Sequence, residues 1–565
     1  MRKFFTIANG IVIILGLIAS FVTYLQTTRV TPLIDYSYQV ENAYRIYQGA
    51  VPFRDFFLVV APGTYWIMAQ IMHLTHGYLH IANVYYVMFV SFFTIWLTYR
   101  ICILLGVSEG ISVILLLPLI FTGQSVYPYP LYDPNVALVI LLALYAFFVT
   151  QKKYHFSQIH YTLAGAVSAL PVFFKQNTGG AYIASFLCIF LFTVIVNKKK
   201  QNIHAYIAFT FGVVFVLASI FLWLLYYGAW DQYIYQTFTF PSVAKNPGDA
   251  MHIILSQYVG YGVLLWNNIF VVLGLMCVVS LIAKIHHARY RNVLLGTLTS
   301  AVCIYLLVYV PALKLHDTFV LCAWVTITLG SVICMFIAFW KRTPTSDVVY
   351  ITLPIILLAS AHATFLSHGV VHSSYHMWPF AVILLGYIAI FIKKHTTKFL
   401  SWWIIVQIFI IFLTILLGQA IISNYAMDYV DRTGNISVVT DGKLKGLHTP
   451  GMWISEFEAM MIYVKNTIPT NARVAFLPGE DPFFSVSERT NPLHFSLLHS
   501  GVYTLAASVI IPELLNNHVD WIVVKTTYQT RPGAWVTNMD EISYWIEKYY
   551  TLSTRIGIYA IYQRK

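Results

Sequence analysis

A short stretch of this sequence concentrates the residue types that could do acid–base chemistry. Only 10% of the chain is charged, yet the stretch Arg29–Trp66, directly after the first apolar run, holds five further charged side chains: Asp35, Glu41, Arg45, Arg54 and Asp55. Tyrosines and phenylalanines alternate with these charges, a composition typical of the membrane–water boundary. Because a carboxylate can act as a general base and an arginine can bind an anion, we predict that this loop carries an active site.

A second candidate group lies between residues 124 and 134, in the sequence QSVYPYPLYDP. Its prolines predict an irregular segment that ends where a helix begins at Pro134, with Asp133 as the N-cap. Tyr127, Tyr129 and Tyr132 would then lie at the mouth of the membrane domain. Two roles are open for Asp133, helix cap and functional group, and both can hold together.

A third group occupies the short turn Val172–Gly180 between two apolar spans. Lys175 is followed there by two amides, Gln176 and Asn177. An ammonium this close to hydrocarbon is costly unless it meets an anion or a partner carboxylate. The alternative is a lysine that extends its charged end to the membrane surface without a specific partner.

Three histidines form a fourth group in the last connection between spans. His368, His372 and His376 recur at i, i+4 and i+8, which would place them on one face of a helix. This spacing could ligate a metal, but no carboxylate or cysteine lies nearby in the sequence. We therefore favour polar histidines that line a headgroup pocket.

The elements that must position these groups are membrane helices. The chain has 565 residues, 59% of them hydrophobic, and a mean hydropathy of +0.70, which no water-soluble domain of this length would show. Apolar runs repeat from Phe4 to Ser423, and we count about thirteen that are long enough to cross the hydrocarbon as helices. The first, Phe4–Leu25, lacks a cleavage site and is predicted to be retained. The shorter segment Pro62–Leu74 is predicted to lie along the membrane surface. The six cysteines fall in or beside the spans and predict packing residues, with no disulfide framework.

The basic residues follow a membrane topology and form no patch for nucleic acid. The formal net charge is +12, but sixteen of the twenty-two Lys and Arg residues before position 424 fall in one alternate set of connections. This positive-inside bias predicts a cytoplasmic N-terminus. Seven of the nine acidic residues in the same region fall on the opposite side, and the tail is nearly neutral. We therefore expect the chemistry to face outward and expect no nucleic-acid partner.

The composition changes after the last span, and we divide the chain into a transmembrane domain (residues 1–423) and an extracytoplasmic α/β domain (residues 424–565). Strand patterns alternate with helical patterns in the second domain. The predicted strands are 436–439, 473–477, 521–525 and 556–562, and the predicted helices are 454–468, 504–517 and 539–550. Since the domain has no Gly-rich phosphate fingerprint and no nucleophile constellation, we predict an acceptor-side or packing module.

Four spaced motifs give the membrane half, roughly residues 1–200, a resemblance to a known group of enzymes. The motifs are Asp35 after the first span, Gly49-x-x-Pro-Phe-Arg-Asp55 with Ala61-Pro-Gly63, Tyr132-Asp-Pro134, and Phe174-Lys-Gln-Asn177. They resemble the bacterial relatives of protein O-mannosyltransferases and lipid A aminoarabinose transferases, which are glycosyltransferases of the GT-C fold. The resemblance implies a polytopic α-helical membrane protein of the bacterial plasma (inner) membrane. It would take a sugar from a polyprenyl-phosphate donor at the outer face and pass it to a cell-envelope acceptor.

The resemblance also implies roles for the candidate residues. Asp35 would be the base that takes the acceptor's proton, and Asp55 would orient the acceptor or a divalent cation. A glycosyl phosphate has a good leaving group, so cations are needed to hold the departing phosphate. The implied donor-phosphate ligands are Arg54, Lys175, Gln176 and His376, and the implied pocket residues are Tyr132, Asp133, Asn177 and His372.

Several alternatives stay open. The eukaryotic mannosyltransferases have Asp-Glu in the first loop, whereas Asp35 is followed by Tyr36. Asp35 and Asp55 could instead brace the loop by pairing with its arginines, Arg45 and Arg54. At the level of function, a lipid-linked oligosaccharide polymerase or ligase would share the donor and the side of the membrane. A non-enzymatic lipid or sugar transporter would share the many spans, but it predicts internal repeats and polar residues at mid-membrane depth, and the sequence shows neither clearly.

Overall fold

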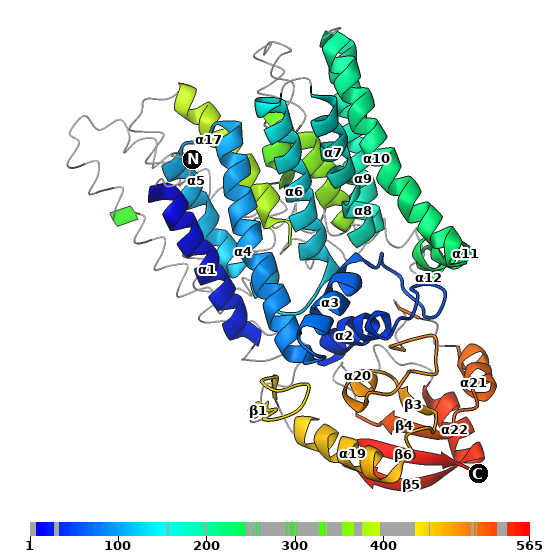
Figure 1. The fold of residues 1–565 in the computed structure, drawn as a ribbon. Coiled ribbons are helices and arrows are strands. Elements are labelled where there is room, and N and C mark those ends of the chain that lie inside the picture. Colours follow the sequence, from blue (N-terminus) through cyan, green and yellow to red (C-terminus); the bar gives the residue numbers. More distant parts are fainter. Residues whose placement is uncertain are drawn as a thin grey trace.

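The computed structural model describes most of the N-terminal half and most of the C-terminal domain (Figure 1). The described residues are 7–27, 33–154, 157–197, 200–244, single positions between 252 and 301, 327–332, 334–335, 353–365, 376–395, 436–450, 453–498, 502–503, 506–527 and 539–565. His368, His372 and the predicted domain boundary after residue 423 lie outside these residues.

Five helices in the described part are long and apolar enough to cross a membrane. They are α1 (Ile7–Thr27), α4 (Leu79–Leu105), α6 (Tyr132–Lys153), α9 (Gln176–Asn197) and α10 (Lys200–Tyr226). Shorter helices complete the bundle in Figure 1: α5 (Glu109–Leu116), α7 (Gln158–Ala169), α8 (Pro171–Phe174), α11 (Trp230–Ile234), α12 (Phe240–Ala244), α17 (Trp378–His395) and a helix over residues 353–365. The prediction of a polytopic helical membrane protein is confirmed. The predicted number of spans includes stretches outside the described residues and stays a prediction.

Small residues determine how closely these helices approach. A Cβ atom built on Gly165 of α7 would lie 2.0 Å from the carbonyl oxygen of Phe209 in α10, and one built on Gly212 of α10 would lie equally close to a carbonyl of α7. The backbones of α7 and α10 are therefore in direct contact. Between α1 and α4, the hydroxyls of Thr23 and Ser91 lie 2.7 Å apart. Lipid gives helices no hydrophobic drive to associate, so contacts of these two kinds hold the bundle together.

Two shorter helices, α2 (Leu33–Tyr47) and α3 (Gly63–Leu74), lie between the spanning helices and the C-terminal domain (Figure 1). The first connection, expected as a loop, is thus largely helical. The apolar segment after Pro62 forms the helix α3, and its position along the membrane surface stays a prediction. The loop between α2 and α3 packs against the turn that follows α11, where the π-helical turn η3 (Tyr235–Thr239) provides Gln236. The Gln236 amide accepts a hydrogen bond from one loop N–H (2.8 Å) and donates one to a loop carbonyl (2.9 Å), which holds the loop in place.

The segment before α6 corrects one prediction. Two 3-10 turns, η1 (Leu117–Phe121) and η2 (Gly123–Ser125), follow α5, and α6 then begins at Tyr132. Asp133 is therefore not the N-cap, and it lies buried inside the first helical turn. Pro134 is compatible with this position because the first-turn N–H groups of a helix have no partner within the helix.

The C-terminal domain is built on a four-stranded sheet with the strand order β3–β4–β6–β5, in which β3 and β4 are parallel and the other pairs are antiparallel. Its elements are β1 (Ile436–Val438), β2 (His448–Pro450), α19 (Trp453–Thr467), β3 (Val474–Leu477), α20 (Phe483–Ser487), α21 (Ala507–Asn516), β4 (Trp521–Lys525), α22 (Met539–Tyr549), β5 (Tyr550–Ile556) and β6 (Tyr559–Arg564). The predicted α/β fold of this domain is confirmed. The single strand predicted over residues 556–562 is in fact a hairpin of β5 and β6.

Alternate residues of the strands bury opposite faces of this sheet. Leu477 and Ile522 pack with α21 and α22, whereas Phe476 and Val523 pack with α19. The cluster on the α19 side is continuous with the buried core of the spanning helices. The C-terminal domain is therefore joined to the membrane domain through apolar packing as well as through hydrogen bonds.

Candidate active site

Asp35 lies in the first turn of α2, where its partly buried carboxylate accepts a hydrogen bond of 3.2 Å from the hydroxyl of Tyr129. Burial raises the pKa of Asp35 to about 6, and the hydrogen bond from Tyr129 opposes part of this effect. At neutral pH the carboxylate is therefore mostly ionised, yet it is a stronger base than an ordinary aspartate.

The chain between η2 and α6 holds Tyr129 in place. The side-chain amide of Gln124 donates to the carbonyl oxygens of Tyr127 (2.6 Å) and Tyr129 (2.5 Å). The Tyr127 ring packs edge-on against the Tyr129 ring, with 6.1 Å between their centroids. The sequence predicts only that Tyr129 lies at the mouth of the membrane domain and gives it no chemical role. For Gln124 the sequence shows only an amide side chain at the end of an apolar run.

Lys175 and Asp133 form a buried ion pair. Lys175 follows the last residue of α8, and both side chains are only 3% exposed. The ammonium also lies over the ring of Tyr132, 5.2 Å from its centroid. The sequence left open whether Lys175 has a partner carboxylate or extends to the membrane surface without one. In the structure it has a partner carboxylate, Asp133.

Tyr132 connects this ion pair with Asp35. Its phenol lies close enough to both Asp35 and Asp133 to interact electrostatically with each carboxylate. The structure thus brings together four of the predicted site residues, Asp35, Tyr132, Asp133 and Lys175. The group combines a carboxylate of raised pKa with a buried ammonium, which is an arrangement that can accept a proton on one side and hold an anion on the other.

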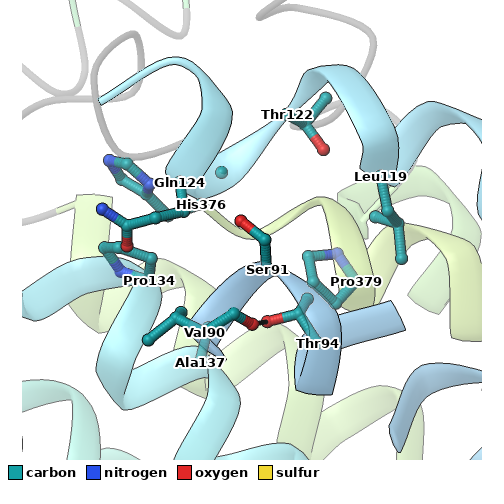
Figure 2. Close-up of a pocket in the computed structure, with 11 residues that line it drawn as sticks. Val90, Ser91, Thr94, Leu119, Thr122, Gln124, Pro134, Ala137, His376 and Pro379 are labelled. Carbon is teal, nitrogen blue, oxygen red and sulfur yellow. Dashed lines mark hydrogen bonds between the residues drawn. The ribbon is translucent and has the colours of Figure 1, made fainter. Parts of the chain in front are cut away.

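His376 is buried in the turn before α17, and its ring packs against Tyr127 with 5.0 Å between the centroids. Together with Gln124 it lines one side of a small cavity between α4, α6 and α17, toward which Ser91 points (Figure 2). The cavity measures about 20 Å³, enough for one water molecule. His376 is thus connected to the Asp35 group through the tyrosines of the segment before α6.

Arg54 and Asp55 pair with each other at the protein surface. The guanidinium donates two hydrogen bonds to the carboxylate (2.7 and 2.8 Å), and the N–H of Val51 donates a third (2.7 Å). The side chains of Arg54 and Asp55 are 46% and 36% exposed. The hydrogen bonds from Arg54 lower the pKa of Asp55, so this carboxylate is a weaker base than Asp35. Asp55 therefore pairs with an arginine of the loop, as the alternative of a loop-bracing pair predicts. Asp35 instead accepts a hydrogen bond from Tyr129.

The two amides of the Val172–Gly180 turn hold backbone groups of neighbouring segments. Gln176 accepts a hydrogen bond from the N–H of Ala61 (3.0 Å) and donates one to a carbonyl of the same loop (3.0 Å). Asn177 donates to the carbonyl of Ala363 (2.8 Å). In this structure both amides position chain segments around Lys175.

The described carboxylates do not form a site for a divalent cation. No three His, Cys, Asp or Glu side chains gather at one point in the described part of the chain. Asp55 forms an ion pair with Arg54, and Asp133 forms an ion pair with Lys175. The donor set near Asp35 therefore does not fit a metal ion, and we derive no step through one.

The comparisons with known proteins concern the fold. No protein-family model matches the chain, and no curated protein is significantly similar to it in sequence. The chain is similar to the solved structure of the Archaeoglobus fulgidus oligosaccharyltransferase in complex with Zn and sulfate, with a TM-score of 0.51 and 12% identity over 91% of this chain and 68% of the other. It is also similar to ArnT from Cupriavidus metallidurans. The structure bound to undecaprenyl phosphate has a TM-score of 0.45 and 11% identity over 98% of both chains, and the apo structure has 0.45 and 10% over 99% of this chain and 98% of the other.

The similarity to the oligosaccharyltransferase shows the fold. The chain is a multi-pass membrane protein of the GT-C fold with a C-terminal α/β domain. At 12% identity the similarity does not extend to donor or acceptor, so both must be argued from the site.

Proposed function

We propose that this protein is an integral-membrane glycosyltransferase that moves a sugar from a polyprenyl-phosphate donor to a hydroxyl of a cell-envelope acceptor. The transfer would be a single displacement at the outer face of the membrane, with Asp35 as the base. The observation that carries the proposal is that Tyr132 interacts with Asp35, a carboxylate of raised pKa, and also with Asp133 of the buried Lys175–Asp133 ion pair. The GT-C fold supplies a scaffold compatible with this chemistry.

The chemistry needs two groups from the protein. In the proposed step the acceptor oxygen bonds to the anomeric carbon as the bond from that carbon to the phosphate oxygen breaks. The hydroxyl proton passes to the base, and polyprenyl phosphate leaves with the electron pair of the broken bond. Because phosphate is already a good leaving group, a positioned base and a cation for the departing phosphate suffice.

Asp35 meets the requirements for the base. Its pKa of about 6 leaves it mostly ionised at neutral pH and still able to accept a proton. The hydroxyl of Tyr129 holds one carboxylate oxygen. The direction of the carboxylate is thereby fixed before the acceptor arrives.

Lys175 is the proposed cation for the phosphate. An ammonium has three N–H donors, and the bond to Asp133 uses one of them. Because Asp133 holds the ammonium in advance, little reorganisation is needed when the donor binds. We assign the exposed Arg54–Asp55 pair to the entrance of the site, where it would contact donor phosphate or acceptor.

The remaining predicted residues receive positioning roles in this proposal. Gln176 and Asn177 hold the backbone around Lys175. His376 supports the segment that carries Tyr129 through its contact with Tyr127.

The proposal is tested by donor consumption. Native mass spectrometry of the purified protein should detect a bound polyprenyl-phosphate lipid. In proteoliposomes supplied with cell-envelope extract as the source of acceptor, the wild-type protein should release free polyprenyl phosphate. Asp35→Asn should lower this release by roughly 10²–10⁴-fold while the lipid stays bound. Asp231→Asn is the matched control, since Asp231 is an exposed aspartate of α11, and it should keep wild-type activity.

Three results would contradict the proposal in different ways. Full activity of Asp35→Asn would remove this residue from the mechanism. Lipid that crosses the vesicle membrane without being consumed would indicate a transporter. Sugar chains that lengthen on the carrier lipid would indicate a lipid-linked oligosaccharide polymerase.

A further inference from the structure

The helix that carries Asp35 is held at its other half by the C-terminal domain. Glu41 of α2 is buried, and one of its carboxylate oxygens accepts hydrogen bonds from both the N–H (3.0 Å) and the hydroxyl (2.6 Å) of Ser485. One turn further along α2, buried Arg45 donates to two carbonyl oxygens within residues 493–495 (2.8 and 2.6 Å). Burial raises the pKa of Glu41 to about 7, so this carboxylate is only partly ionised at neutral pH. The Arg45 guanidinium is charged, and hydrogen bonds from a charged donor are stronger than neutral ones.

The same part of the C-terminal domain makes two further contacts with this region. We refer to residues 482–496 as the docking segment. Its Ser496 hydroxyl donates to the side-chain carbonyl of Asn42 (2.8 Å), and its His494 carbonyl accepts from the N–H of Phe57 (2.8 Å). The docking segment thus contacts both α2 and the loop that follows it.

The docking segment is in turn fixed to the sheet. Immediately before it, buried Glu480 and Asp481 pair with the ammonium of Lys525 at the end of β4 (3.2 and 2.8 Å). The Phe483 ring stacks on the Phe476 ring of β3, with 5.0 Å between the centroids. The position of α2 is therefore tied to strands β3 and β4 of the C-terminal domain.

A continuous helix transmits this constraint to Asp35. Asp35 and Asn42 are seven residues apart in α2, which places them two turns, or about 10 Å, apart along the axis. A shift or rotation of α2 at the docking contacts would displace the Asp35 carboxylate from Tyr129. Misplacement of a reacting group by about 1 Å can cost on the order of 10²-fold in rate.

We propose that the docking segment is a positioning element of the active site and that Glu41 is the residue through which it sets the place of the Asp35 carboxylate. This inference rests on the proposed function, because it takes Asp35 as the base. The Lys175–Asp133 pair lies on other elements, with Asp133 in α6 and Lys175 between α8 and α9. Loss of the docking contacts should therefore slow the proton-transfer step and leave donor binding intact.

The test compares folded variants in the full-length protein. Ser485→Ala and Glu41→Ala should lower kcat for polyprenyl phosphate release by about 10-fold to 100-fold, with donor KM within about twofold of wild type. They should also shift the acidic limb of the pH–rate profile, since the pKa of Asp35 depends on its burial and on Tyr129. Glu41→Gln keeps an oxygen that accepts from Ser485 and should retain most of the activity.

Ser487→Ala is the matched control for Ser485→Ala. Ser487 belongs to the same short helix, but its hydroxyl donates within that helix, to the carbonyl of Phe484 (3.4 Å). It should leave kcat, KM and the pH profile unchanged. Amide hydrogen exchange gives a readout independent of turnover: the first half of α2, residues 33–40, should exchange faster in Ser485→Ala than in Ser487→Ala.

The outcomes separate this inference from the proposed function. Unchanged kcat, pH profile and hydrogen exchange in folded Glu41→Ala and Ser485→Ala would overturn the positioning role. Full activity of Asp35→Asn would overturn the proposed function, whatever the docking variants do. A purely structural role of Glu41 would reduce the yield of folded protein without moving the pH profile of the folded fraction.

Discussion

At the scale of single residues, the protonation of Asp35 should set the pH dependence of transfer. A base must be ionised to accept a proton, and burial raises the pKa of Asp35 to about 6. The rate of polyprenyl phosphate release should therefore rise as the pH increases through about 6 and level off above it. Tyr129→Phe removes a hydrogen bond that lowers this pKa, so the rise should move to higher pH. Tyr78→Phe, at an exposed tyrosine, is the control, and an identical profile for all three proteins would contradict the assignment.

The pair of Lys175 and Asp133 allows donor binding to be separated from stability. Lys175→Met alone leaves the Asp133 charge buried without its ammonium, which should destabilise the protein by about 3–5 kcal/mol. Lys175→Met combined with Asp133→Asn removes both charges and should recover most of this loss. Thermal unfolding in detergent measures the stability, and native mass spectrometry measures the bound lipid. Because the double variant lacks the ammonium, it should bind the donor more weakly than the wild-type protein even though its stability is restored. A double variant that is stable and binds the donor as tightly as wild type would show that Lys175 has a structural role only.

What the sequence revealed about these residues depended on how far apart the partners lie along the chain. The place of Lys175 in a short turn beside the hydrocarbon favoured an anionic partner and left open a lysine without a specific partner. The sequence did not identify Asp133 as the partner of Lys175, because 42 positions separate the two residues. The hydrogen bond between Glu41 and Ser485 joins residues that are 444 positions apart. Nothing in the sequence around either residue indicates that the two are in contact.

At the scale of elements, five of the long apolar runs are helices long enough to cross a membrane in the part of the chain that the structure describes, because a membrane-spanning helix needs about 20 apolar residues in a row. Shorter elements were harder to predict. Pro134 is acceptable anywhere in a first helical turn, so it could not show that α6 begins at Tyr132. Strand β5 is an edge strand with mostly exposed side chains, and it therefore lacks the apolar alternation by which a strand is recognised.

The contact between α7 and α10 leads to a prediction about stability. Gly165→Ala or Gly212→Ala would place a methyl group 2.0 Å from a backbone carbonyl oxygen, and the two helices would have to separate. We expect each to destabilise the protein by about 1–3 kcal/mol, seen as a lower midpoint in circular-dichroism melts in detergent. Gly180→Ala in α9 is the control, because a Cβ there meets nothing within 4 Å. It should be neutral or slightly stabilising, since alanine favours a helix over glycine.

At the scale of the whole molecule, the start of α1 and the C-terminal domain lie at opposite ends of the helix bundle (Figure 1). Asp35 and the docking segment lie at the end that carries the C-terminal domain. One buried apolar cluster runs from the spanning helices into the sheet. Asp35, the docking segment and the C-terminal domain therefore lie at one end of the bundle, and the distribution of basic residues predicts that this end faces outward.

This orientation can be tested with single cysteines in an otherwise cysteine-free protein. Asp441 lies in the exposed turn between β1 and β2, and Gln201 is exposed at the start of α10, beside the basic connection at residues 198–200. A membrane-impermeant thiol reagent should label Asp441→Cys in intact cells and should label Gln201→Cys only after the membrane is permeabilised. Both sites are exposed in the folded protein, so a difference in labelling reports the side of the membrane and not burial. The reverse pattern would place the C-terminal domain and Asp35 in the cytoplasm, and transfer at the outer face would then be impossible.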